Sequence, residues 1–174
     1  QSFSVSQLIE YLRKTHNYYL QNKIPEIESL ISDMASELEV DEGSHKLLQK
    51  FFEEYKNELV KHIEKEENLV YPYILNLEKA LSAKEVSSEL ISQIKKDSIR
   101  SYEEEHDNVE EKLMDLKNII IKYLPSSESQ QSRYKLFKEL TVLEKDLIDH
   151  ARMEDLVLVP KVEILEKLVT EICI

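Results

Sequence analysis

Glycine, proline, cysteine and tryptophan are scarce in this chain of 174 residues, which has one glycine, four prolines, one cysteine and no tryptophan. β-Turns and bulges depend on glycine and proline, whereas the Glu, Lys, Leu and Ile that fill the chain suit helices. The composition therefore predicts an all-α fold. A domain usually holds about 100 to 150 residues, so we expect a single domain over residues 1–174.

The lack of cysteine and of basic clusters excludes several classes of protein. A lone Cys173 cannot form a disulfide within the chain or a thiolate metal site, and it fits a reducing compartment. A net charge of −12 argues against nucleic acid or an anionic membrane as partner. No apolar run approaches the ~18 residues of a membrane span and no signal peptide is visible, so we expect a cytoplasmic protein. The chain begins at Gln1 rather than Met, which is consistent with removal of an N-terminal segment.

Apolar residues recur at spacings of three and four almost throughout, which is the pattern of amphipathic helices. Short connections between the long helices predict an antiparallel four-helix bundle with a short C-terminal helix. The form Ser-x-x-Glu at 82–85 predicts a helix start there, and Pro72 should kink the second helix. The expected helices, with breaks near prolines and near Gly43, cover about 5–22 continuing past Pro25 to 39, 44–81, 85–124, 130–159 and 161–172.

A repeat underlies this plan. The stretch "HIEKEENLVYP" at 62–72 returns as "HARMEDLVLVP" at 150–160, with His, Glu, a second acid and Pro at the same offsets. His16 stands 46 residues before the first copy (62 − 16) and His106 stands 44 before the second (150 − 106). The chain therefore reads as two copies of one helix pair, related by pseudo-twofold symmetry.

Polar residues interrupt the apolar stripe that each long helix should turn toward the core. Burying them unpaired would cost several kcal/mol per carboxylate and about 1–3 kcal/mol per imidazole, against a total stability of about 5–15 kcal/mol. Beyond the glutamates the stripes are expected to continue at Leu69 or Val70 and at Val157. The six interrupting residues are His16, His62, Glu66, His106, His150 and Glu154.

Two metal ions would satisfy these six groups, with two imidazoles for each ion and two carboxylates that bridge them. Nitrogen and oxygen ligands without thiolate suit iron or manganese better than structural zinc. Four protein ligands per ion leave room for an oxo or hydroxo bridge and an open position, which indicates small-molecule chemistry. The alternative is an interaction bundle whose histidines are merely packed, and the matching of the two copies argues against it.

Other polar residues are expected to lie outside the centre. His45 should be a surface or capping residue near a helix start, with an extra ligand as the alternative. Glu67 and Asp155 follow the two glutamates directly and should point about 100° away, toward solvent. A phenol near the metals would be a hydrogen-bond donor to a bound ligand. The tyrosines expected in the core or at its rim are Tyr19, Tyr71, Tyr73 and Tyr102.

Through these residues the sequence resembles the hemerythrin-like family and, within it, the bacterial iron–sulfur cluster repair proteins of the RIC type. The resemblance covers nearly the whole chain, and its specific part is the two His-x-x-x-Glu blocks with their prolines. It implies two non-haem iron ions, with manganese or zinc as substitutes, and Glu66 and Glu154 as bridges. The terminal ligands that it implies are His16, His62, His106 and His150.

The sequence departs from parts of the family. Oxygen carriers have a second His four residues from the one on the third helix, where this chain has Tyr102 and Glu110. Carriers also use an Asp five residues after the last His, so Asp155 is an alternative to Glu154. The repair proteins commonly carry an N-terminal domain with adjacent cysteines, and this chain shows none.

The resemblance implies repair of iron–sulfur clusters under oxidative or nitrosative stress. The centre would donate iron, reduce nitric oxide at the open iron position, or both, and nitric oxide reduction is the one enzymatic activity expected. Its partners would be damaged iron–sulfur proteins and small diatomic ligands. The alternative is a sensor or store of hemerythrin type that binds oxygen, nitric oxide or iron without turnover.

Overall fold

The computed structural model contains helices and no strands in the residues that it describes, which confirms the all-α fold. Those residues are 3–35, 42–96, 98–100, 106–123 and 130–172, without the side chains of 35, 106–111, 119, 122–123 and 130. The α-helices are α1 (Val5–Tyr18), α2 (Ile24–Ala35), α3 (Glu42–Lys65), α4 (Tyr71–Ala83), α5 (Ser88–Lys96), α6 (His106–Tyr123), α7 (Gln130–Met153) and α8 (Val159–Glu171). Three π-helical turns join some of them, namely η1 (Tyr19–Lys23), η2 (Glu66–Val70) and η4 (Glu154–Leu158).

The chain divides into two compact units. Unit 1 comprises Gln1–Thr15, His62–His106 and Asp149–Ile174, and unit 2 comprises His16–Lys61 and Asp107–Ile148. Helices α1, α3 and α7 each contribute residues to both units. The expectation of a single domain stays a prediction.

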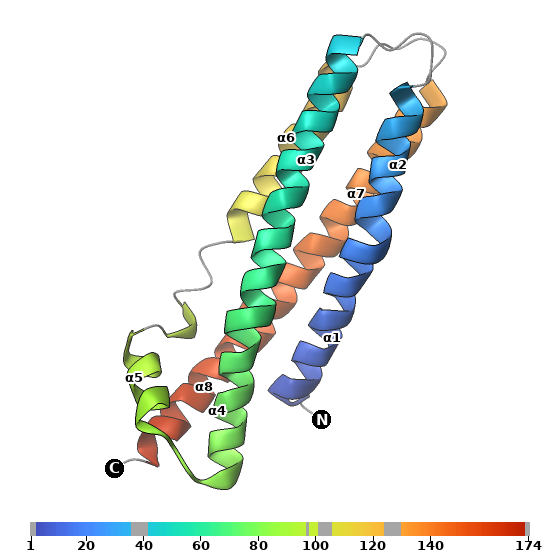
Figure 1. Ribbon diagram of the computed structural model, residues 1–174. Coiled ribbons are helices and arrows are strands. Elements are labelled where there is room, and N and C mark those ends of the chain that lie inside the picture. Colours follow the sequence, from blue (N-terminus) through green and yellow to red (C-terminus); the bar gives the residue numbers. More distant parts are fainter. Residues whose placement is uncertain (1–2, 36–41, 97, 101–105, 124–129, 173–174) are drawn as a thin grey trace. The chain divides into compact units, whose positions relative to one another are not determined.

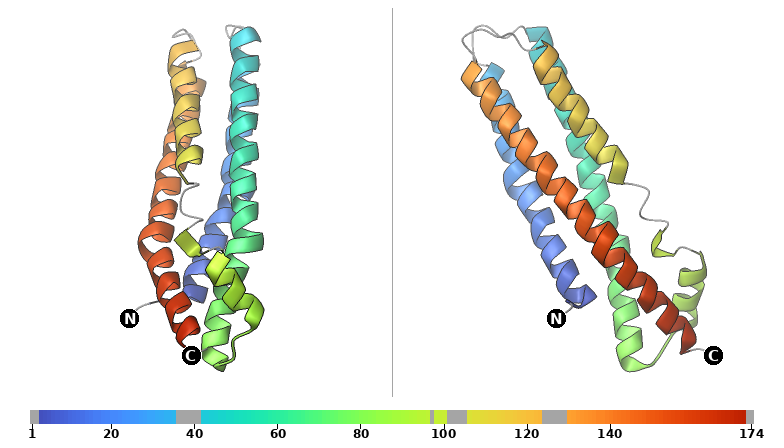
Figure 2. Two further views of the ribbon diagram at one scale, coloured as in Figure 1. Left: turned by 90° about the vertical axis from the view of Figure 1, so that its left-hand side faces the viewer. Right: turned by 180° about the vertical axis from the view of Figure 1, so that it is seen from behind.

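Unit 2 is a bundle of helices α2, α3, α6 and α7, which lie side by side in all views (Figures 1 and 2). Burial of one large apolar side chain contributes about 1.5–3 kcal/mol, so the apolar interior carries most of the stability of this unit. The interior includes Ile27, Ile31, Leu48, Phe52, Leu59, Leu113, Leu116, Leu136, Leu140 and Leu143. Ion pairs join neighbouring helices: Glu28 with Lys56, Glu58 with Lys112, Lys117 with Glu144, and Lys23 of η1 with Glu139.

Unit 1 has its own apolar core, built by the first part of α1 together with α4, α5 and α8. Within it, Tyr73 on α4 donates a hydrogen bond to Oε1 of Glu166 on α8 over 2.7 Å. The backbone N–H of Ile99 donates to the same oxygen over 2.9 Å. The core includes Leu8, Ile9, Leu12, Val70, Tyr71, Ile74, Leu77, Leu90, Ile99, Leu158 and Val162.

The expected third helix is wrong as one continuous element. Helix α5 ends at Lys96 and α6 begins at His106. Between them, the buried Ile99 gives its N–H to the Glu166 side chain rather than to a helical carbonyl. The sequence did not reveal this break because no glycine or proline lies near it, and the hydrogen bond to Glu166 depends on tertiary structure.

The expected capping box at 82–85 is also wrong. Helix α4 continues to Ala83, and Ser82 Oγ donates back to the carbonyl of Glu78. Lys84 then takes the left-handed conformation that ends the helix, with φ of 55°. Ser87 caps the next helix instead, since its Oγ accepts from the N–H of Leu90 over 3.2 Å.

Three prolines each follow a π-helical turn and do not break the helix. Each turn begins six residues before its proline, at Tyr19, Glu66 and Glu154 (25 − 19, 72 − 66 and 160 − 154). The residue before each proline donates its N–H to the carbonyl five residues back. A proline lacks an N–H and its ring crowds the preceding turn, and the wider π turn accommodates both effects. The expected breaks at Pro25 and Pro160 are therefore continuous helix.

The extra residue in each π turn also shifts the inward stripe. Val70 is buried while Leu69 is exposed, so Val70 is the correct one of the two expected positions. In the second copy the expected Val157 is only half-buried and Leu158 is buried in its place. A strict helical period cannot foresee this shift, because it assumes 3.6 residues in every turn.

Two leucines of η4 allow the shifted register to be tested. Leu158 is 2% exposed and Leu156 is 73% exposed. We expect Leu158→Ala to lower the free energy of unfolding by about 2–5 kcal/mol, because it leaves a cavity in the core. Leu156→Ala is the matched control and should change stability by less than about 0.5 kcal/mol. Urea denaturation monitored by helical circular dichroism measures both, and equal losses would contradict this register.

Candidate metal centre

Each glutamate of the repeat begins a π-helical turn. Glu66 is the first residue of η2 and Glu154 is the first residue of η4. Their side chains are deeply buried, with 6% and 4% of the residue exposed. Because π turns are rare and often lie at functional sites, both glutamates stand where a site is expected.

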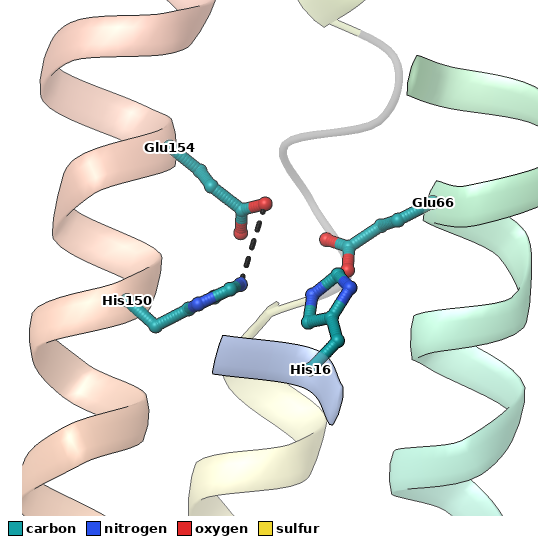
Figure 3. Close-up of side chains that lie close together, drawn as sticks. All are labelled: His16, Glu66, His150 and Glu154. Atoms are coloured by element: carbon teal, nitrogen blue, oxygen red, sulfur yellow. Dashed lines mark ion pairs between the residues drawn. The ribbon is translucent and has the colours of Figure 1, made fainter. Parts of the chain in front are cut away.

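Four of the six expected ligands lie together. Their ligand atoms, from His16, Glu66, His150 and Glu154, are all within 4.8 Å of one another, and all four residues are buried. Figure 3 shows their side chains pointing toward one another, with a dashed line that joins Nε2 of His150 to the carboxylate of Glu154. His16 is the first residue of unit 2, and it follows Thr15 of unit 1 in the continuous helix α1.

The other two expected ligands have different outcomes. His62 is half-buried and lies outside this group of four, but its Nε2 is 3.2 Å from Oε1 of Glu66. The corresponding distance from His150 Nε2 to Glu154 Oε1 is 3.5 Å. His106 begins α6 and its side chain lies outside the described residues. The side chain of Glu110 and the whole of Tyr102 also lie outside them.

The acids that follow the two glutamates do not join the group. Glu67 is half-buried and accepts a hydrogen bond from Arg13 Nε over 2.7 Å, so it is more than a solvated surface acid. Asp155 is half-buried as well. Among the described residues, the group of four contains Glu154 and leaves out Asp155, which favours Glu154 as the ligand.

His45 is not the surface residue that we expected. It is 8% exposed, and neither ring nitrogen has a hydrogen-bond partner among the described residues. Helix α3 begins at Glu42, so the apolar stripe that includes Leu48 and Phe52 extends back to His45. The spacing of three residues between His45 and Leu48 could have predicted the burial of His45. The expected helix break near Gly43 led instead to a surface position.

Tyr71 contacts the group, although the sequence placed it only as a core or rim aromatic. It is fully buried, and its hydroxyl donates a hydrogen bond to Oε1 of Glu154 over 2.8 Å. Burial, together with the nearby charges of Glu154 and Glu66, raises the pKa of the Tyr71 phenol above its usual value. The phenol therefore stays protonated near neutral pH and remains a donor.

Thr15 is a second contact that the sequence did not indicate. Its hydroxyl donates to the carbonyl of Leu12 over 2.7 Å, and its oxygen lies 2.7 Å from Nδ1 of His150. A hydroxyl has one hydrogen, so the Thr15 oxygen must accept from His150, which places the imidazole hydrogen on Nδ1. The lone pair of His150 is then on Nε2, the nitrogen that faces Glu154.

The donor set fits a metal cation. Two imidazoles and two carboxylates converge in a buried space, where two nearby negative charges repel each other strongly unless positive charge is supplied between them. Nitrogen and oxygen donors of this kind suit iron, manganese or zinc. The arrangement therefore favours a cation between the four residues.

Comparison with known proteins agrees with this reading of the donors. The model of the hemerythrin family, described as the hemerythrin HHE cation binding domain, matches residues 7–162. No curated protein and no solved structure gives a significant match. None of the described helices combines the length and apolar content that crossing a bilayer requires.

The tautomer of His150 can be tested through Thr15. We expect Thr15→Val to weaken metal binding about 10-fold or more, because partners that orient a ligating histidine typically contribute that much. Thr15→Ser keeps the hydroxyl and should bind nearly as well as the unchanged protein. Competition with a chromophoric chelator under anaerobic conditions measures the affinity, and equal affinities for the two variants would contradict this role of Thr15.

Proposed function

Because the chain belongs to the hemerythrin family of cation-binding domains, we propose that it holds two non-haem iron ions. The observation that supports this proposal is the burial of Glu66 and Glu154 beside two imidazoles within 4.8 Å. Two carboxylates in an apolar interior repel each other, and cations between them remove that repulsion. The proposed ligands are His16, His62, Glu66, His106, His150 and Glu154.

In this proposal the four histidines would each bind one iron ion, and the two glutamates would hold both ions. Iron at such a centre supplies one-electron redox chemistry and an open position for a small ligand. Glu154 and His150 are themselves 4% and 8% exposed, so bulk water has little access to them. Manganese and zinc are the substitutes that the same donors would accept.

For the biological role we propose repair of iron–sulfur clusters under oxidative or nitrosative stress in the cytoplasm. The support is the resemblance of the two His-x-x-x-Glu blocks to the repair proteins, and the Tyr102 and Glu110 that replace the second histidine of oxygen carriers. The partners would be damaged iron–sulfur proteins and diatomic ligands. Iron donation and nitric oxide reduction are the two forms that the repair takes.

A sensor or store without turnover is the second candidate, and one observation favours it. All four residues of the group are buried, and an enclosed site releases metal more slowly than an open one. Slow release suits storage or sensing, whereas donation requires the ion to leave.

The metal content tests the centre itself. We expect about two iron ions per chain in protein made in iron-replete medium, and loss of both in the double variant Glu66→Gln with Glu154→Gln. The matched control is Glu64→Gln with Asp149→Asn, which changes two exposed acids of α3 and α7 and should keep both ions. Elemental analysis measures the content. If the variant Glu66→Gln with Glu154→Gln keeps as much iron as the control variant and the unchanged protein, the buried glutamates hold no metal.

The biological role needs a separate experiment. Iron-loaded protein, added anaerobically to an iron–sulfur enzyme inactivated by nitric oxide, is expected to restore activity faster than the same amount of free ferrous iron. The double variant Glu66→Gln with Glu154→Gln is the control and should add nothing. A stable and reversible oxygen adduct in stopped-flow spectra, without any reactivation, would instead establish carriage or sensing.

A further inference from the structure

We propose that Tyr71 is a positioning residue of the metal centre, whose hydroxyl holds the carboxylate of Glu154 in the orientation that binds metal. The inference rests on the proposed function, since it needs metal at Glu154. It concerns residues of unit 1 only. The contact that carries it is the hydrogen bond of 2.8 Å from Tyr71 to Oε1 of Glu154.

Tyr71 forms hydrogen bonds with the glutamates of both copies of the repeat. Tyr71 is the first residue of α4, and its N–H donates to the carbonyl of Glu66, which closes the π turn η2. Its hydroxyl reaches Glu154, the first residue of η4. One stretch of helix therefore supplies Glu66 to the centre and also holds Glu154. Their relative placement is fixed through a single side chain.

The hydrogen bond leaves Glu154 able to bind metal. An ionised carboxylate has about four lone-pair sites on its two oxygens. The phenol occupies one of them, on Oε1, and restricts rotation of the carboxylate plane. A restrained carboxylate loses less conformational entropy when it binds an ion, so the hydrogen bond should raise affinity.

Arg13 and Glu67 hold the Tyr71 ring in turn. The guanidinium of Arg13 lies over this ring, 5.7 Å from its centroid. Its Nε donates to Oε2 of Glu67 over 2.7 Å, and Glu67 is the residue next to Glu66. A cation over an aromatic face is attracted by about 0.5–1 kcal/mol at partly exposed sites. These contacts restrain the orientation of the ring.

The repeat shows that the phenol is not required by packing. The two copies are offset by 88 residues (154 − 66), so the counterpart of Tyr71 is Val159. Val159 is also buried in the core of unit 1, and it cannot donate a hydrogen bond from its side chain. An apolar residue therefore fills this place in one copy. The hydroxyl in the other copy, in a fully buried position, calls for a role beyond packing.

Tyr71→Phe tests the proposal, and Tyr73→Phe is the matched control. Tyr73 lies on the same helix, is buried, and donates to a buried glutamate over 2.7 Å, but that glutamate is Glu166, outside the group of four. Each substitution removes one phenol hydroxyl bonded to one buried carboxylate. A purely structural role predicts similar effects of the two on the stability and on the metal affinity of the chain.

We expect Tyr71→Phe to weaken Fe²⁺ binding about 10- to 100-fold in anaerobic chelator competition, the usual effect of losing such a partner. Tyr73→Phe should change the affinity less than about 3-fold, because Tyr73 contacts Glu166 and no residue that orients a proposed ligand. The visible absorption bands of Co²⁺-loaded protein should shift in the first variant alone, because they report the ligand geometry. Helical circular dichroism and thermal unfolding of the metal-free variants establish that both are folded.

Three results would overturn the inference. If both variants keep the Fe²⁺ affinity and the Co²⁺ spectrum of the unchanged protein, Tyr71 does not act on the centre, and the proposed function stands. If both variants lose the same amount of affinity, the effect of each is structural alone. Unchanged protein that takes up neither Fe²⁺ nor Co²⁺ would overturn the proposed function and this inference together.

Discussion

The burial of two carboxylates beside two imidazoles is the constraint on which the rest of this structure depends. Each buried carboxylate costs several kcal/mol unless it is neutralised, and a domain of this size has only about 5–15 kcal/mol of stability. Glu66 and Glu154 nevertheless lie within 4.8 Å of His16 and His150. A cation bound between these four residues would neutralise the carboxylates and link the helices that carry them.

The local backbone structure positions both glutamates, and neighbouring side chains form hydrogen bonds with the group. Each one begins a π turn that accommodates a proline six residues later, so a helix can carry both a buried glutamate and a proline without ending. The third such turn begins at Tyr19, whose hydroxyl donates to the carbonyl of Asp146 over 3.0 Å. The same backbone device thus places buried polar side chains three times. Tyr71 and Thr15 contact Glu154 and His150 by hydrogen bonds.

The sequence predicted the helical class and the inward stripes because both follow from apolar periodicity and from the repeat. It also placed Glu154 and His150 in the core, since they replace leucines in a stripe. It could not predict the shift to Leu158, because a π turn changes the period, nor the end of α5, which depends on a hydrogen bond to Glu166. The contacts of Tyr71 come from tertiary structure, which no spacing encodes.

Anomalous diffraction at the iron absorption edge, from crystals of the iron-loaded protein, tests the central claim most directly. The account predicts two peaks a few ångströms apart, bounded by the side chains of His16, Glu66, His150 and Glu154. Absence of iron from this group in fully loaded protein, or iron bound only at acidic residues of the surface, would contradict it. The buried carboxylates would then need another source of positive charge.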